Sequence, residues 1–134
     1  MKVVGVLAAL GTLCSMLPDV SADESPKIVG PDHIQLKVCP GKQLVLDCKA
    51  YPNCEDDLTL IYWLVNGSFL EIEFDDGRMT ETEESTSEGG AILQRSLMVK
   101  NVTSEDFNST FTCVVTNPAG IAQKYITLES KNNQ

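Results

Sequence analysis

Apolar and polar residues alternate in short runs along the chain, and turns rich in Gly, Pro, Asn and Asp separate these runs. Such alternation is typical of half-buried strands. Strands that recur at intervals of about 8 to 12 residues, with no helical period between them, predict an antiparallel β-sandwich. The expected strands cover residues 34–38, 44–48, 60–65, 69–74, 91–99, 111–116 and 121–128. The segment 78–88 is polar and weakly patterned.

The strand around Trp63 has large apolar residues at every position. Successive side chains on a strand point to opposite sides, so an inward Trp63 takes Ile61 and Val65 inward with it. The remaining side chains then face outward: Leu60, Tyr62 and Leu64. A stripe of large apolar groups on an outer sheet face commonly marks a partner surface.

A hairpin extends this outer surface. Asn66-Gly67 is a strong turn signal and returns the chain as a strand over 69–74. In the phase that buries Leu70, the outward side chains are Phe69, Glu71 and Glu73. Leu64 is expected to lie beyond the reach of this strand. Aromatic groups with an acidic rim are typical of a binding hot spot. The alternative is that a neighbouring loop covers these side chains, or that they are ordinary exposed residues at a sheet edge.

The cysteines support one immunoglobulin-like domain. Cys48, Trp63 and Cys113 have the order and spacing in which two cysteines bridge the sheets and a tryptophan packs on the bridge. Cys39 and Cys54 lie beyond opposite ends of the second strand, on the order of 20 Å apart at the usual rise per residue. A disulfide needs far closer Cα atoms. We therefore expect Cys39 and Cys54 to lack an intrachain partner and one or both to be available for a disulfide-linked homodimer.

Two alternatives remain for Cys39 and Cys54: a buried free thiol, or an irregular lead-in that brings the two together.

The first 22 residues predict a secretory signal peptide, with an apolar run from Val3 to Leu17 and a small-residue cleavage site after it. The run is too short to span a membrane. We expect a secreted, extracellular protein with one immunoglobulin-like domain over 23–129 and a disordered polar tail over 130–134. The formal net charge of −9 disfavours nucleic acid and membrane and favours a basic protein partner. Solubility alone is the alternative explanation.

Candidate catalytic chemistry is sparse. His33 is the single histidine, so no histidine-activated nucleophile is expected. The cysteines lack zinc spacing, and Gly89-Gly90 is a turn and not a phosphate loop. The sequence thus predicts a binding protein that is not an enzyme, with no metal and no cofactor. Three sequons predict glycosylation of a secreted chain: Asn66, Asn101 and Asn108. A glycan on Asn66 would lie beside the expected partner surface, so either it tilts away or this sequon is unused.

Several motifs together resemble the secreted interleukin-18-binding proteins of mammals and poxviruses, from about Pro31 to Leu128. They are Tyr62-Trp63-Leu64, Asn66-Gly67-Ser68-Phe69, Glu71, Phe111-Thr112-Cys113-Val114 and the closing run from Gly120 to Leu128. The third immunoglobulin domain of interleukin-1-type receptors is similar more loosely. Two departures from a common immunoglobulin pattern are Phe111 in place of a tyrosine and Asp106 seven residues before Cys113.

The resemblance implies a single domain that captures the cytokine on the sheet containing the tryptophan strand. On matching positions, Tyr62 and Phe69 are anchors and Glu71 pairs with basic cytokine residues. Strand phase adds Leu60 and Glu73.

The predicted function is therefore a secreted decoy that binds interleukin-18 and blocks its receptor engagement. One alternative is a soluble interleukin-1-receptor-type domain for another cytokine. Another is a structural or adhesion domain.

Overall fold

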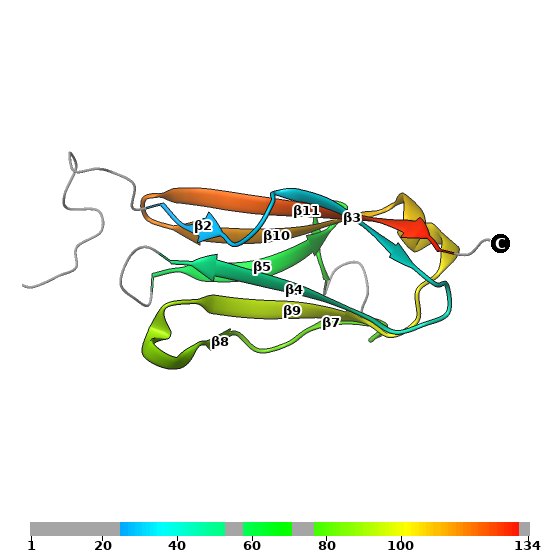
Figure 1. Ribbon diagram of the computed structural model, residues 1–134, viewed down its shortest axis with the longest axis horizontal. Coiled ribbons are helices and arrows are strands. Elements are labelled where there is room, and N and C mark those ends of the chain that lie inside the picture. The colour runs from blue at the N-terminus through cyan, green and yellow to red at the C-terminus, as the bar shows by residue number, and fades with distance from the viewer. Residues whose placement is uncertain (1–24, 53–57, 71–76, 132–134) are drawn as a thin grey trace, which may run out of the picture.

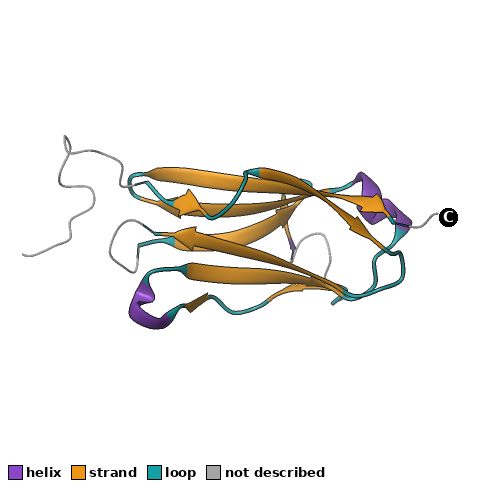
Figure 2. Ribbon diagram, viewed as in Figure 1, coloured by secondary structure: helices purple, strands orange, loops and turns teal. Residues whose placement is uncertain are grey.

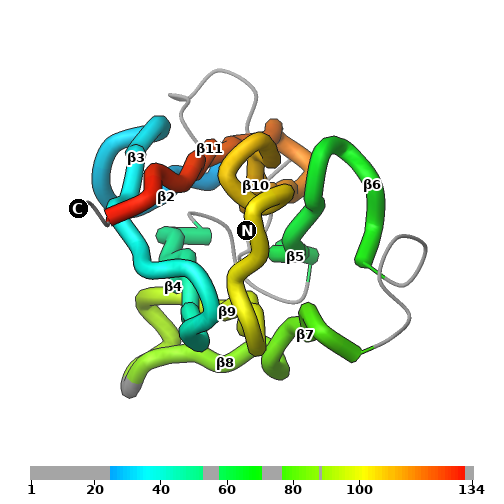
Figure 3. The backbone as a smooth tube through the Cα atoms, turned by 90° about the vertical axis from the view of Figure 1, so that its right-hand side faces the viewer, coloured from blue at the N-terminus to red at the C-terminus, as the bar shows by residue number. Residues whose placement is uncertain are grey.

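The computed structural model describes residues 25–52, 58–70 and 77–131, which fold as two β-sheets packed face to face (Figure 1, Figure 3). The β5 sheet has the order β3 (His33–Val38), β11 (Gly120–Ser130), β10 (Thr110–Asn117), β5 (Leu60–Val65) and β6 (Ser68–Phe69). The β4 sheet has the order β2 (Lys27–Ile28), β4 (Leu44–Tyr51), β9 (Leu93–Val99) and β7 (Met79–Glu81), with β8 (Ser85–Thr86) also on β9. The predicted all-β, immunoglobulin-like sandwich is confirmed.

One strand pair departs from the predicted antiparallel pattern. β3 lies parallel to β11, because the chain enters beside β4 as β2 and then crosses to the other sheet before β3. The crossing passes through Gly30, whose φ of 91° is rarely adopted by residues with a side chain. The lead-in therefore contributes one short strand to each sheet.

A disulfide joins the two sheets at the centre of the core. Cys48 on β4 and Cys113 on β10 have Cα atoms 6.4 Å apart, which confirms the predicted pairing. Trp63 lies opposite Cys113 in the β5–β10 ladder and is fully buried. The bridge spans a sequence separation of 65 residues, and closure of a loop of that size stabilises a fold by about 4 kcal/mol.

The polar segment 78–88 contains two strands that the sequence pattern did not predict. β7 and β8 both pair with β9, and Met79 is the buried residue that β7 contributes to the core. Strands of two or three residues pair through their backbone and are too short to show alternation. The predicted return strand over 69–74 is described only to Leu70, and β6 itself ends at Phe69.

Two short 3₁₀ helices connect strands, η3 (Glu88–Gly90) and η4 (Ser104–Asn108) (Figure 2). Asp106 of η4 is buried and accepts two hydrogen bonds from the Arg78 guanidinium, at 2.9 and 3.1 Å. It also accepts the backbone N–H of Thr103 at 2.8 Å, at the start of η4. Asp106 precedes Cys113 by seven residues, which departs from the common immunoglobulin spacing. It still connects the start of β7 to the segment that leads into β10.

Several predicted features lie at or beyond the limits of the described residues. β11 includes Ser130, and the N–H of Lys131 donates to the carbonyl of Val38 at 2.8 Å, so the first two residues of the expected polar tail lie along β3. Residues 132–134 and the predicted signal peptide, 1–22, are outside the described ranges, as is Cys54. Cys39 is exposed and has no disulfide partner within those ranges.

Candidate functional site

Leu60, Tyr62 and Leu64 face outward from β5, as their phase predicted. Their neighbours Ile61, Trp63 and Val65 are buried, whereas Leu60 is exposed and the other two are half-buried. The cause is the two-residue period of the strand, which sends alternate side chains to the core and to the outer surface. The candidate binding residues of β5 therefore share one surface.

The Asn66-Gly67 turn brings Phe69 over the same surface. Both turn residues have positive φ, 52° and 84°, as a type I′ hairpin requires. The ring of Phe69 lies 5.6 Å from that of Tyr62, centroid to centroid, with the planes inclined by 34°. Phe69 is 49% exposed, so this pair presents an aromatic surface to solvent.

The register of this hairpin corrects the prediction for Leu64. A two-residue turn pairs Val65 with Ser68, which places Phe69 directly opposite Leu64. Leu64 is therefore within reach of the Phe69 strand. Tyr62 is the diagonal neighbour of Phe69, a separation that aromatic side chains can bridge.

Asn66 fastens the turn to β10. Its Oδ1 accepts the N–H of Thr110 at 2.9 Å, and its Nδ2 donates to the hydroxyl of Ser109 at 3.3 Å. Ser109 and Thr110 belong to the Asn108 sequon, so the Asn66 side chain contacts the other two residues of that sequon. Asn101 and Asn108 are exposed.

The outer surface continues across β10 onto β11, an extension that the sequence prediction did not include. Val114 lies opposite Tyr62 and is 1% exposed, although it belongs to no part of the core cluster. Thr116 lies between Leu60 and Ile121, and Thr112 lies between Leu64 and Tyr125. Ile121 is 58% exposed and Tyr125 40%. The missed signal was the outward phase of these β11 residues, opposite to that of buried Ile126 and Leu128.

The acidic residues of the predicted site lie outside the described residues. Glu71 and Glu73 follow Leu70, which is buried as the predicted phase requires. Among the described residues, no three His, Cys, Asp or Glu side chains gather into a group that could hold a metal ion. His33 is exposed on β3 opposite Tyr125.

A model of the family described as Yaba-Like Disease Virus IL18BP matches residues 33–130. The chain belongs to this IL18BP-like family. The matched range contains every described strand except β2, and it includes the whole outer surface of β5, β6 and β10.

The chain is also similar to two interleukin-1 receptors of type 2. The rat protein is 27% identical over 116 residues, which is 82% of this chain and 27% of the receptor. The mouse protein is 27% identical over 110 residues, 78% of this chain and 26% of the receptor. The chain thus spans about a quarter of the length of these relatives.

Solved structures support the fold. A chain of the crystal structure of Dpr2 Ig1-Ig2 in complex with DIP-Theta Ig1-Ig3 matches with a TM-score of 0.57 and 20% identity, over 79% of this chain and 32% of that one. The M1 domain from titin matches with a TM-score of 0.54 and 23% identity, over 85% and 99%. Within the described ranges, no helix has the length and apolar character needed to cross a membrane.

Proposed function

We propose that this protein is a secreted decoy that binds interleukin-18, blocks its engagement of the receptor and so inhibits signalling without chemistry. The observation that carries the proposal is the contact between half-buried Tyr62 and exposed Phe69 on the outer surface of the β5 sheet, in a chain of the IL18BP-like family. Its membership of that family favours a cytokine as the partner.

Tyr62 and Phe69 are proposed as the anchors, with Leu60 extending the apolar contact along β5. A buried aromatic anchor at the centre of an interface commonly contributes about 2 kcal/mol or more when truncated to alanine. Glu71 and Glu73 are proposed as charge partners of basic cytokine residues. The net charge of −9 supports the acidic role, since it would speed association with a basic protein.

The decisive test is a binding panel of interleukin-18 and other cytokines of the interleukin-1 family. We expect Phe69→Ala to weaken interleukin-18 binding by about 2 kcal/mol, roughly 30-fold in Kd. Tyr51→Ala is the matched control, because Tyr51 is a 44% exposed aromatic on β4 in the other sheet. We expect Tyr51→Ala to change Kd less than about twofold. The proposal would be overturned if the wild-type protein showed no measurable binding of interleukin-18.

A second candidate function is a domain of interleukin-1-receptor type that binds a different cytokine. The similarity to interleukin-1 receptor type 2 favours it. The same panel separates the two, because this alternative predicts affinity for another family member in place of interleukin-18. A structural or adhesion domain would instead self-associate in ultracentrifugation and bind none of the cytokines.

Secretion carries two further proposals. Asn66, Asn101 and Asn108 would carry glycans, and a mass loss on treatment with an N-glycosidase checks their occupancy. Cys39 and Cys54 would lack an intrachain partner, and one or both would link two copies. A non-reducing gel of wild type, Cys39→Ser and Cys54→Ser locates the bridge. A purely monomeric wild type contradicts it.

A further inference from the structure

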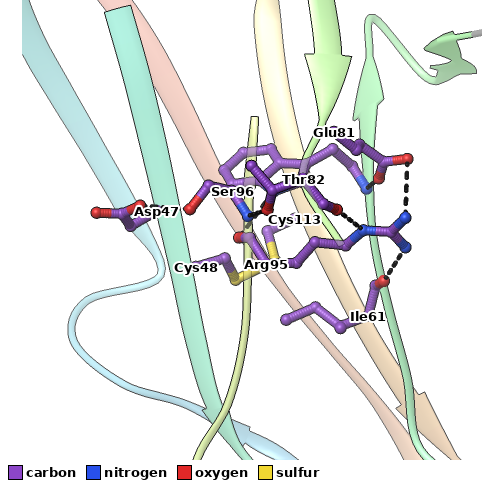
Figure 4. The surroundings of a disulfide bond; sticks show 9 residues. Asp47, Cys48, Ile61, Glu81, Thr82, Arg95, Ser96 and Cys113 are labelled. Carbon is purple, nitrogen blue, oxygen red and sulfur yellow. Dashed lines mark hydrogen bonds and ion pairs between the residues drawn. A yellow bond between two sulfur atoms is a disulfide. The ribbon is translucent and has the colours of Figure 1, made fainter. Parts of the chain in front are cut away.

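Among the described residues, two side chains bond to the outer edge of β5 beyond the short pairing with β6. β6 pairs with β5 only at Leu64 and Val65. The carbonyl of Ile61 and the N–H of Trp63 lie further along this edge, and the partners found for them among the described residues are side chains. Two charged side chains from the β4 sheet, Glu81 and Arg95, reach across the side of the sandwich to them (Figure 4).

The two side chains supply one hydrogen-bond acceptor and one donor to β5, as the backbone of a paired strand would. Glu81 Oε2 accepts the N–H of Trp63 at 2.7 Å, and Arg95 Nη1 donates to the carbonyl of Ile61 at 3.1 Å. An antiparallel partner would present the same two functions, one acceptor and one donor. Both bonds involve an ionised group, and such bonds are stronger than those between neutral groups.

The position of both side chains is itself fixed. Arg95 lies opposite Cys48 and Glu81 opposite Leu97, so each occupies an inward-facing position at the open side of the sandwich. Arg95 Nε donates to the carbonyl of Thr82 at 2.8 Å, and Arg95 Nη2 lies 3.8 Å from Glu81 Oε1. The carbonyl of Arg95 accepts the indole N–H of Trp63 at 3.1 Å.

Tyr62 stands between the two backbone groups that Glu81 and Arg95 hold. We propose that Glu81 and Arg95 are positioning residues for the cytokine-binding surface: they keep this part of β5 straight and so hold the Tyr62 ring against Phe69. This inference rests on the proposed function of that surface. It adds two residues, neither of which touches the partner, to the determinants of binding.

A second ion pair, which ties other elements together, provides the control. Arg78 and Asp106 form a bidentate pair that is more buried than Arg95 and Glu81 and holds no group of β5. Arg→Lys at either site keeps the charge and removes the fork geometry. Arg95→Lys is therefore expected to loosen the contact with β5, whereas Arg78→Lys is expected to loosen the contact with Asp106 of η4.

The experiment compares Arg95→Lys, Glu81→Ala and Glu81→Gln with Arg78→Lys. We expect the first two to speed exchange of the Trp63 amide by about tenfold or more, and to weaken the nuclear Overhauser contact between the Tyr62 and Phe69 rings. Glu81→Gln keeps a carbonyl oxygen for the Trp63 N–H and should stay close to wild type. Arg78→Lys should lower the melting temperature and leave both signals of β5 unchanged.

The binding arm uses mature interleukin-18 as the probe. Arg95→Lys and Glu81→Ala should raise the dissociation rate about fivefold, and Arg78→Lys less than about twofold. The inference is overturned if amide exchange of Trp63 and the contact between the two rings do not change. It is also overturned if the dissociation rate rises in proportion to the loss of melting temperature in every variant, Arg78→Lys included. Wild type without affinity for interleukin-18 overturns the proposed function instead, and the amide and ring signals then decide the positioning role alone.

Discussion

The outer surfaces of the two sheets differ, although their inner surfaces are built alike. On the β5 sheet the outward positions include exposed Leu60, Phe69, Ile121 and Tyr125. On the β4 sheet two of the three outward pairs of the β4–β9 ladder are polar, Asp47–Ser96 and Lys49–Gln94, and the third is Val45–Met98. Among them, the Ser96 hydroxyl donates to the Asp47 carboxylate.

This difference teaches where function resides in such a domain. Burial of alternate residues is common to both sheets and follows from the need to exclude water from one core. Outward side chains do not have to be apolar for the core to form. Apolar side chains that remain exposed to water there are therefore not explained by folding and indicate a partner surface. The β5 sheet is therefore the side on which a partner is expected.

The largest expected effect comes from separating the two sheets. The double variant Cys48→Ala, Cys113→Ala should lower the free energy of unfolding by about 4 kcal/mol, because the bridge restricts the unfolded chain. Urea denaturation followed by Trp63 fluorescence measures it. Cys39→Ser, which removes an exposed cysteine outside the bridge between the sheets, should stay within about 0.5 kcal/mol of wild type. Equal stability of the double variant would mean that packing alone joins the sheets.

A smaller effect tests whether the aromatic pair acts as a unit. In a double-mutant cycle on interleukin-18 binding, Tyr62→Ala and Phe69→Ala should show a coupling of about 1 kcal/mol, as expected for rings in contact. Surface plasmon resonance on the four proteins gives the value. Strictly additive losses would show that the two rings contribute separately.

The extent of the surface is tested by Leu60 and Ile121, which flank Thr116. Leu60→Ala should weaken interleukin-18 binding by about 1 kcal/mol, and Ile121→Ala, two strands further from β6, by about half of that. Val45→Ala is the control on the β4 sheet, where Val45 is 46% exposed. Titration calorimetry measures all three. A loss for Val45→Ala as large as that for Leu60→Ala would remove the distinction between the sheets.

The smallest effect separates apolar contact from overall charge. Raising the ionic strength from about 0.05 to 0.5 M should slow association several-fold and change dissociation little, because salt screens long-range attraction more than buried contacts. Stopped-flow fluorescence gives the association rate. Association that is insensitive to salt would contradict a steering role for the net charge of −9.

The sandwich was predictable because its signals are local or depend on spacing. Cys48, Trp63 and Cys113 identify the two sheets, and alternation identifies each long strand. β7 and β8 were not predictable, since strands of this length are held by β9 and not by their own pattern. The Leu64 register needed the pairing of Val65 with Ser68, which only the turn geometry determines.

The candidate site was predictable in part for a related reason. Tyr62 and Phe69 are close in sequence and joined by one turn, so strand phase sufficed to place them. Ile121 and Tyr125 meet them only through β10, and no local pattern reports that neighbourhood. Arg95 gave one signal in the sequence, because it is a charged residue at an inward position of its strand. Its acceptor on β5, the carbonyl of Ile61, is 34 residues away along the chain and could not be predicted from it.

The bonded edge of β5 also bears on solubility. An open strand edge beside an apolar surface is a template on which a second chain can add as a further strand, and growth of this kind leads to fibres. With the Ile61 carbonyl and the Trp63 N–H already bonded to Arg95 and Glu81, an incoming strand would have to displace two charged groups. The domain can therefore expose Leu60 and Phe69 to a partner while its edge resists aggregation.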